Sequence, residues 1–222
     1  MDFDLSEDQR LLQDSLGKLL TAKYGFEDRK KYMKTADGWS RDLWAQYAEL
    51  GILGLPFAEA DGGFGGGPVE TMLVAEALGG AITLEPWMAT VVMGGGFIRH
   101  GATAAQRAEI VPGIAGGETL LAFAYAEPQA RYDLFDVKTT AKKDGAGWVL
   151  NGRKGVVVHG DVANHLVVTA RTGGGQRDKD GIGVFLVPAD AQGVTRNGFP
   201  TNDGQRAADI TFDNVKLGAE AA

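Results

Sequence analysis

Few side chains in this 222-residue sequence are of types that could carry out catalysis or bind a metal. There is no cysteine, which excludes a thiolate nucleophile, a cysteine metal site and a disulfide framework. The three histidines, His100, His159 and His165, are not spaced like the clustered partners of a metal site or a catalytic triad. We therefore expect structural or surface roles for them, and we predict no metal site and no catalytic residue.

Acidic residues are the other candidates for acid–base chemistry. Asp133 and Asp136 are close enough in sequence to form a pair of carboxylates, but we interpret both as solvated. Glu85 has the character of a buried acid. Glu127 directly follows an apolar run, and we interpret it as an acid that fixes a turn.

Glycine is the residue type that stands out, with 33 copies. Several glycines are clustered, at positions 62–63, 65–67, 94–96 and 173–175. We favour loops and turns for these clusters. The sequence contains no G-x-x-x-x-G-K-[ST] motif and no G-x-G-x-x-G motif, so no phosphate-binding fingerprint is predicted.

The composition is that of a globular protein, with 44% hydrophobic and 23% charged residues. A net charge of −7 and an isoelectric point near 5.0 argue against a nucleic-acid partner. The opening segment MDFDLSEDQR has no apolar core, so it does not resemble a secretory signal. No run approaches the ~18 apolar residues of a membrane span. We expect a cytoplasmic protein that contacts no membrane.

The first ~120 residues have helical patterning, within the boundary errors of such assignments. Ser6 and Gln9 form a capping box, Ser40 can cap a second helix, and Pro68 suits the first turn of a third. Apolar residues recur at helical spacing after each signal. Helices are expected near residues 6–20, 40–50, 68–80, 87–100 and 103–114.

From Leu121 onward, short runs rich in valine and aromatic residues replace the helical period. Strands are expected at residues 121–125, 137–142, 148–151, 156–158, 165–170, 182–188 and 210–212. The dipeptides Asp144-Gly145 and Asn151-Gly152 are turn signals between them. The sequence thus predicts an α+β protein, with an all-helical bundle domain at residues 1–117 and a β-barrel or sandwich-like domain at residues 118–222.

Five stretches, in order, resemble the acyl-CoA dehydrogenase family. They are LGILGLP and DGGFG within residues 50–65, GATAAQRAEIVPGIAGGE at 101–118, AYAEP at 124–128, NGRK at 151–154 with AN at 163–164, and FDNV at 212–215. Each is weak alone, but their order over a helix-then-strand pattern is specific, and the resemblance covers essentially the whole chain. It implies an oxidoreductase of fatty-acid or lipid metabolism that dehydrogenates the α,β-bond of an acyl-CoA thioester with FAD.

The resemblance also implies which residues face the ligands. It places the flavin ring of FAD against Phe123, Tyr125, Ala126, Val156 and Val158. It places the acyl-CoA against Arg131, Tyr132 and Asp133, where a guanidinium could bind a phosphate. In the family the catalytic glutamate usually lies in a third, helical domain after the β domain, so no residue of this chain is assigned as the base.

The sequence departs from the family where the flavin would bind. The family's flavin-bonding threonine is Ala126, its tryptophan is Val156, its hydroxyl residue beside flavin N5 is Val158, and its following asparagine is His159. The serine of the family's G-S-D turn is Tyr132. Four lost contacts, each worth roughly 0.5–1.5 kcal/mol, sum to roughly 2–5 kcal/mol. We therefore expect this chain alone to bind FAD weakly and to be inactive.

Three functions remain open at this point. The first is an ordinary acyl-CoA dehydrogenase. The second is a non-catalytic subunit of a heteromeric dehydrogenase, and the third is a flavin monooxygenase of the same fold. Each would be a homo- or hetero-oligomer, a dimer or a tetramer. The missing hydroxyls and tryptophan favour the second, and the N-terminal motifs disfavour the third.

Overall fold

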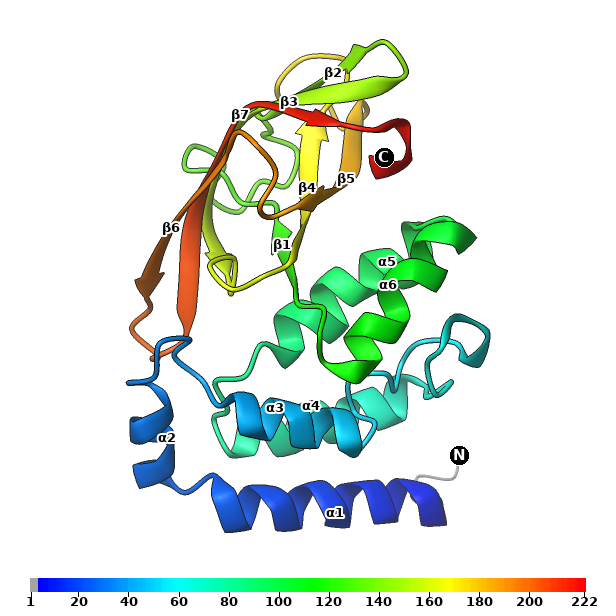
Figure 1. Cartoon of the computed structure of the whole chain (residues 1–222), viewed down its shortest axis with the longest axis vertical. Coiled ribbons are helices and arrows are strands. Elements are labelled where there is room, and N and C mark those ends of the chain that lie inside the picture. Colours follow the sequence, from blue (N-terminus) through cyan, green and yellow to red (C-terminus); the bar gives the residue numbers. More distant parts are fainter. Residues whose placement is uncertain (1–3) are drawn as a thin grey trace. The chain divides into compact units, whose positions relative to one another are not determined.

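A computed structural model describes residues 4–222, so the first three residues of the segment judged not to be a secretory signal lie outside it. The chain divides into two compact units (Figure 1). The first contains the residues up to Val91 together with Ile98–Thr119, and the second contains Val92–Phe97 and Leu120–Ala222. A helical region followed by a curled, mixed β-sheet that forms a half-barrel confirms the predicted α+β class.

The helices start where the sequence signals predict. They are α1 (Glu7–Lys23), α2 (Phe26–Tyr32), α3 (Arg41–Glu49), η1 (Glu59–Asp61), α4 (Pro68–Gly80), η2 (Met88–Gly94), α5 (Gly95–Gly101) and α6 (Ala104–Gly116). The Ser6–Gln9 capping box is formed, Ser40 caps α3 through the N–H of Leu43, and Pro68 opens α4. The segment expected as one helix at 87–100 is instead a π-helix, η2, that continues into α5. Helix α2 was not predicted, because its mostly charged sequence has no apolar stripe.

Helix α1 runs alongside α4 in the helical unit (Figure 1), and Gln9 Nε2 donates to Glu70 Oε1 at 2.7 Å. Glu85 is buried there, as expected, and accepts the Ser40 N–H at 3.1 Å. Burial raises the pKa of its carboxyl group above the usual value. Among residues 4–222, no helix is both long and apolar enough to cross a membrane.

The second unit is built on one sheet of seven strands. They are β1 (Leu121–Ala124), β2 (Thr140–Asp144), β3 (Gly147–Val158), β4 (His165–Arg171), β5 (Ile182–Pro188), β6 (Val194–Pro200) and β7 (Arg206–Leu217), followed by η3 (Ala219–Ala221). The strand order is β1-β4-β2-β3-β7-β6, with β5 paired to β4. The β1–β4 and β2–β4 pairs are parallel and the others antiparallel. Buried aliphatic side chains of β3, β4, β5 and β7 form the core.

Strand β3 corrects part of the sequence prediction. The runs expected as separate strands at 148–151 and 156–158 form one strand of 12 residues. Asn151-Gly152 is therefore not a turn but lies at a β-bulge, where the register with β7 shifts between Leu150 and Gly152. Asp144-Gly145 is the predicted turn and closes the β2–β3 hairpin. Strand β6 was missed because its sequence, VTRNGFP, is mostly polar and exposed.

The bulge at Gly152 gives a first testable prediction. Its φ is +152°, and a Cβ there would lie 2.5 Å from Thr139 Oγ1 and 2.6 Å from Thr139 Cα. We expect Gly152→Ala to lower the free energy of unfolding by about 2 kcal/mol or more, because backbone and side chain must both move. The measurement is urea unfolding followed by circular dichroism.

Gly155→Ala, in the same strand, is the matched control. A Cβ at Gly155 would meet its nearest atom, Asp209 Oδ1, at 3.6 Å, which is ordinary contact. This variant should retain the stability of the wild type within about 1 kcal/mol. Equal losses for the two alanines would contradict the geometry of the bulge.

Candidate functional site

The segment after β1 is bonded tightly to β3. Gly155 N–H donates to the Ala126 carbonyl at 2.9 Å, and Lys154 Nζ donates to the Tyr125 carbonyl at 3.2 Å. Two stretches that are far apart in sequence, AYAEP and NGRK, thus lie side by side. The structure brings Tyr125 and Ala126 next to the bulge that carries Val156.

Aromatic rings extend this cluster along β1. Phe123 and Tyr125 are stacked, with ring centroids 4.8 Å apart and planes 23° apart. Phe97 lies against the other ring, with its centroid 4.5 Å from that of Phe123. Tyr125 is about one-third exposed. The three rings offer a planar apolar surface of the kind on which an aromatic ligand ring can stack.

A second register shift, between Lys154 and Val157, lies at the end of β3. It turns Val156 outward, so that 58% of the side chain is exposed. The φ of Val156 is +51°, which is an outlier for a β-branched residue and costs roughly 1–3 kcal/mol. Such strain is concentrated at ligand-binding positions in proteins, so Val156 remains a candidate contact.

Main-chain donors are available where side-chain hydroxyls are missing. His159 N–H donates to the Arg206 carbonyl at 2.9 Å, so by antiparallel alternation the N–H and C=O of Val158 point away from β7. Strand β2 pairs with β3 only as far as Asn151, so that edge is open at Val158. Within the described chain, the Ala126 N–H has no hydrogen-bond partner. The residues present therefore fit a flavin through main-chain donors only.

His159 follows this edge and is almost completely buried, with 3% of its surface exposed. Its φ is +55°, and within the described residues its Nδ1 has no hydrogen-bond partner. Burial lowers the pKa of the imidazole to about 4, although the charges of Asp161 and Asp203 oppose the shift. His159 is therefore a neutral side chain inside the fold near pH 7. His100 is exposed and His165 is half-buried.

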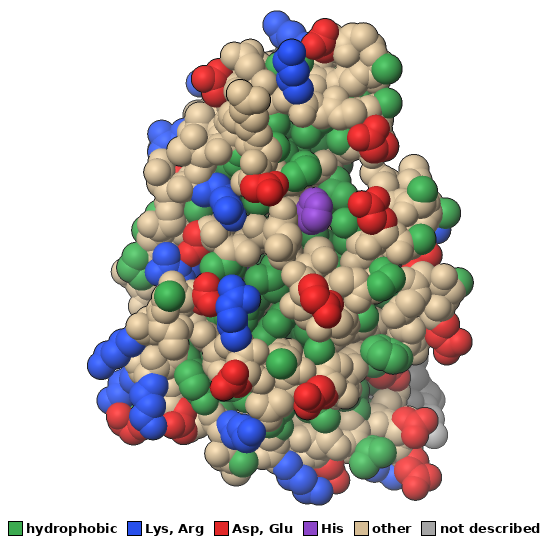
Figure 2. All heavy atoms as spheres, viewed as in Figure 1, with side chains coloured by type: hydrophobic (Ala, Val, Ile, Leu, Met, Phe, Trp, Pro, Cys, Tyr) green, Lys and Arg blue, Asp and Glu red, His purple; other side chains and the backbone are tan. Residues whose placement is uncertain are grey.

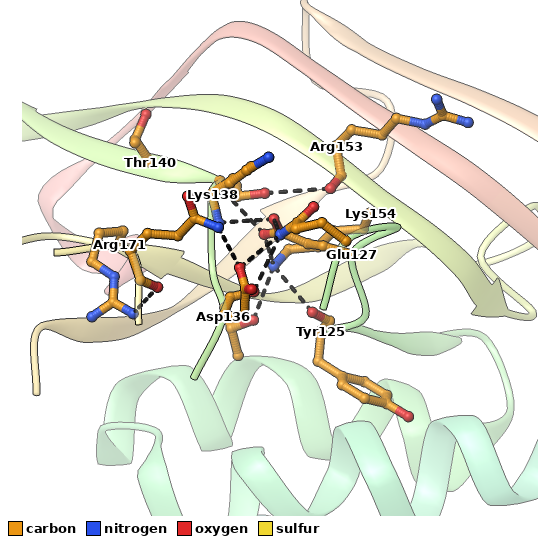
Figure 3. A network of polar contacts seen from close by, with 12 residues as sticks. Tyr125, Glu127, Asp136, Lys138, Thr140, Arg153, Lys154 and Arg171 are labelled. Carbon is orange, nitrogen blue, oxygen red and sulfur yellow. Dashed lines mark hydrogen bonds and ion pairs between the residues drawn. The ribbon is translucent and has the colours of Figure 1, made fainter. Parts of the chain in front are cut away.

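An ion pair between Glu127 and Lys154 lies behind the cluster (Figure 3), with Nζ–Oε1 at 2.8 Å and side chains 2% and 0% exposed. Glu127 also accepts the N–H groups of Lys138 and Thr139, at 2.8 and 3.0 Å, which confirms that it fixes a turn. Burial raises the pKa of Glu127, but these donors and the Lys154 charge outweigh it, so the net shift is downward. Burial lowers the pKa of Lys154.

The predicted acyl-CoA contacts lie on the loop between β1 and β2. Arg131, Tyr132 and Asp133 are all exposed, Tyr132 completely so. Arg131 has a φ of +53°, and Asp133 Oδ1 accepts the Phe135 N–H at 2.8 Å. Among residues 4–222, no hydrogen bond joins these three side chains to Tyr125, Ala126 or Val156. The loop holds them in solvent, ready for a ligand.

Asp136 corrects the sequence interpretation, because it is not solvated like Asp133 but only 2% exposed. Its Oδ2 accepts from Arg177 Nε at 2.9 Å, and its Oδ1 accepts from the amide of Gln176. Gln129 Nε2 bridges it to Glu127, at 3.2 and 2.9 Å (Figure 3). The only sequence signal for its burial was the glutamines and arginine available as donors, and these lie far away along the chain.

Arg171 is the residue of this region that the sequence analysis missed. It is 7% exposed, and its Nη1 donates to the carbonyls of Asp178 and Asp180 at 2.9 and 2.7 Å. Its Nη2 donates to the carbonyls of Phe135 and Gln176 at 2.8 and 2.9 Å. An arginine at the end of an apolar strand, directly before a glycine cluster, was the signal that could have indicated it.

The surface adds no strongly charged feature. On the face shown in Figure 2, acidic and basic side chains are interspersed, and the basic ones do not gather into a patch. Over the part of the chain that the structure describes, no three His, Asp or Glu side chains are arranged to hold a metal ion. The chemistry of the region therefore depends on the stacked rings, the strained bulge and the main-chain donors.

The fold is that of the acyl-CoA dehydrogenases. The ChsE4–ChsE5 complex from Mycobacterium tuberculosis superposes with a TM-score of 0.87 at 24% identity, covering 100% of this chain and 58% of the other. The family models for the acyl-CoA dehydrogenase N-terminal and middle domains match residues 6–118 and 122–215. The chain belongs to the acyl-CoA dehydrogenase family.

Two further relatives show the extent of the similarity. Acyl-CoA dehydrogenase FadE12 of Mycobacterium tuberculosis is 31% identical over 225 residues, covering 97% of this chain and 56% of FadE12. A variant of the Tcur3481–Tcur3483 steroid ACAD has a TM-score of 0.84 at 30% identity, covering 96% of this chain and 56% of that chain. The chain thus spans a little over half the length of these relatives.

Proposed function

We propose that this chain forms the N-terminal and middle parts of a flavin-dependent acyl-CoA dehydrogenase, which removes hydrogen from the α,β-bond of an acyl-CoA thioester. The observation that carries the proposal is the bonding of Tyr125 and Ala126 to the β3 bulge, through Lys154 and Gly155. This bonding fixes an apolar surface with open main-chain donors beside it. We keep residues 1–117 and 118–222 as the proposed domains.

The proposed roles of this chain are binding and orientation. FAD, when bound, would supply the acceptor for the hydride that leaves the substrate β-carbon. Phe123, Tyr125 and Val156 would lie against the flavin, and the N–H groups of Ala126 and Val158 would donate to it. Arg131, Tyr132 and Asp133 would contact the acyl-CoA. No residue described here is assigned the removal of the α-proton.

A second candidate is a non-catalytic subunit of a heteromeric acyl-CoA dehydrogenase. The apolar Ala126, Val156 and Val158 favour it, since none of their side chains can hydrogen-bond a flavin. The name of the Tcur3481–Tcur3483 steroid ACAD joins two gene products, which supports a heteromeric assembly for the present chain as well. Under either candidate we propose an oligomer in the cytoplasm.

The two candidates differ in how they bind FAD. We expect the isolated chain to bind FAD with a dissociation constant above micromolar, so that it is colourless when purified. Restoring two hydroxyls with Ala126→Thr and Val158→Thr should tighten binding by about 1–3 kcal/mol, because each adds a hydrogen bond to the ring. The measurement is calorimetric titration of FAD into the wild type and the double variant.

Val184→Thr is the control for this experiment. Val184 lies on β5 and is 38% exposed, as is Val158, but it is outside the proposed cofactor site. It should leave FAD affinity unchanged. A yellow protein with stoichiometric FAD would contradict weak binding and favour the first candidate, and no gain in the double variant would contradict the assignment of these positions to the flavin.

A further inference from the structure

The loop that carries Arg131, Tyr132 and Asp133 has anchors at both ends. At its start, Glu127 is held by Lys154 and by the N–H groups of Lys138 and Thr139. At its far end, the Phe135 carbonyl accepts from Arg171 Nη2 at 2.8 Å. The exposed residues between these anchors make up the loop surface, which includes the completely exposed Tyr132.

The anchor at the far end does not come from a neighbouring residue. Arg171 stands at the end of β4, and three of its four carbonyl partners, those of Gln176, Asp178 and Asp180, belong to the connection between β4 and β5. One guanidinium therefore joins two loops. Val137 N–H adds a bond to the Gln176 carbonyl at 3.0 Å.

A guanidinium is suited to this task because its donors form a rigid planar fork. A lysine in its place would present a point charge that could not hold four carbonyls of two loops in one plane. Without these contacts the loop would keep its anchor at Glu127 and lose its bond at Phe135.

We propose that Arg171 is a positioning residue, which holds the β4–β5 connection against the β1–β2 loop and thereby sets where Arg131, Tyr132 and Asp133 meet an acyl-CoA. The part that concerns acyl-CoA rests on the proposed function above. The part that concerns the loop rests on the hydrogen bonds alone. The two parts are tested separately.

The first test measures loop order without any ligand. Trypsin can cut after Arg131, and mass spectrometry can follow that cleavage specifically. We expect Arg171→Gln to raise the initial cleavage rate at Arg131 by about tenfold or more, because charge-assisted bonds that close the loop are lost. Arg171→Lys should fall between the variant and the wild type. An unchanged rate in Arg171→Gln would overturn the proposal.

Arg196→Gln is the matched control. Arg196 also donates to three carbonyls, those of Gly160, Asp161 and Ala163, but these belong to the β3–β4 connection. It should leave cleavage at Arg131 within about twofold of the wild type. An equal rise in both variants would mean general loosening and would overturn a specific role for Arg171.

Two further measurements complete the test. If Arg171→Gln does not fold, hydrogen exchange on the wild type decides: the Val137 amide should be protected, and free-chain exchange there would overturn the proposal. Calorimetric titration with butyryl-CoA should show about tenfold weaker binding in Arg171→Gln than in the wild type or Arg196→Gln. If the wild type itself does not bind butyryl-CoA, the proposed function fails, while the cleavage rates still decide the role of Arg171.

Discussion

Lys154→Met should lower the free energy of unfolding of the sheet unit by about 3–5 kcal/mol, the largest loss that we expect from a single substitution. The substitution leaves the Glu127 carboxylate buried without its cation, and it also removes the bonds from Nζ to the Tyr125 carbonyl and to Thr169 Oγ1. Methionine has a similar length and leaves little cavity. The measurement is chemical unfolding at pH 7.

Removing both charges should cost less than the separate losses suggest. In Glu127→Gln with Lys154→Met, no uncompensated charge remains, and the amide oxygen can still accept one backbone N–H. We expect the double variant to be about 2 kcal/mol more stable than the sum of the single losses indicates. The neighbouring Arg153→Met, which breaks a largely exposed pair with Asp209, should cost less than about 1 kcal/mol. Equal losses for Arg153 and Lys154 would refute the importance of burial.

The second large effect concerns pH. The unfolded chain protonates His159 near its usual pKa of about 6.5, whereas the buried imidazole has a pKa of about 4. Between these values the unfolded state binds the extra proton, so stability is fully present above pH 6.5 and is lost as the pH falls toward 4. The shift corresponds to about 3 kcal/mol. The measurement is the free energy of unfolding at half-unit steps of pH.

His159→Asn should flatten that profile. Asparagine tolerates the positive φ of this position and does not titrate. The variant should therefore lose about 3 kcal/mol less stability than the wild type between pH 7 and pH 4. His100→Asn, which removes an exposed histidine, should keep the profile of the wild type. A profile that is the same in His159→Asn and the wild type would show that the imidazole is not buried in solution.

Local signals predicted the helical unit well and the sheet less well. The capping box at Ser6, the cap at Ser40 and Pro68 act within one turn of helix, so the sequence contains all that is needed to place them. Asn151-Gly152 was misread because the same dipeptide suits a turn and a bulge. Which of the two forms depends on Thr139, which packs against Gly152 from another part of the chain.

The candidate site shows the same limit. The motifs AYAEP and NGRK pointed to Tyr125, Ala126 and Val156, and the structure places these residues together through Lys154 and Gly155. The burial of Asp136 and the four contacts of Arg171 were not predictable, because their partners lie on two separate loops. Buried polar groups are satisfied by tertiary contacts that no local pattern encodes.

The pairing of β1 has a consequence for the order in which this protein folds. β1 pairs only with β4, in parallel, so that Leu121 must wait for His165 before its first backbone bond can form. Hairpins such as β2–β3 and β4–β5 close locally, whereas this parallel pair closes a long loop and is intrinsically slow. The stacked rings of Phe123 and Tyr125 and the segment bonded to β3 should therefore be among the last parts of the sheet unit to assemble. A refolding chain would acquire its sheet before it acquires the surface proposed to bind the cofactor.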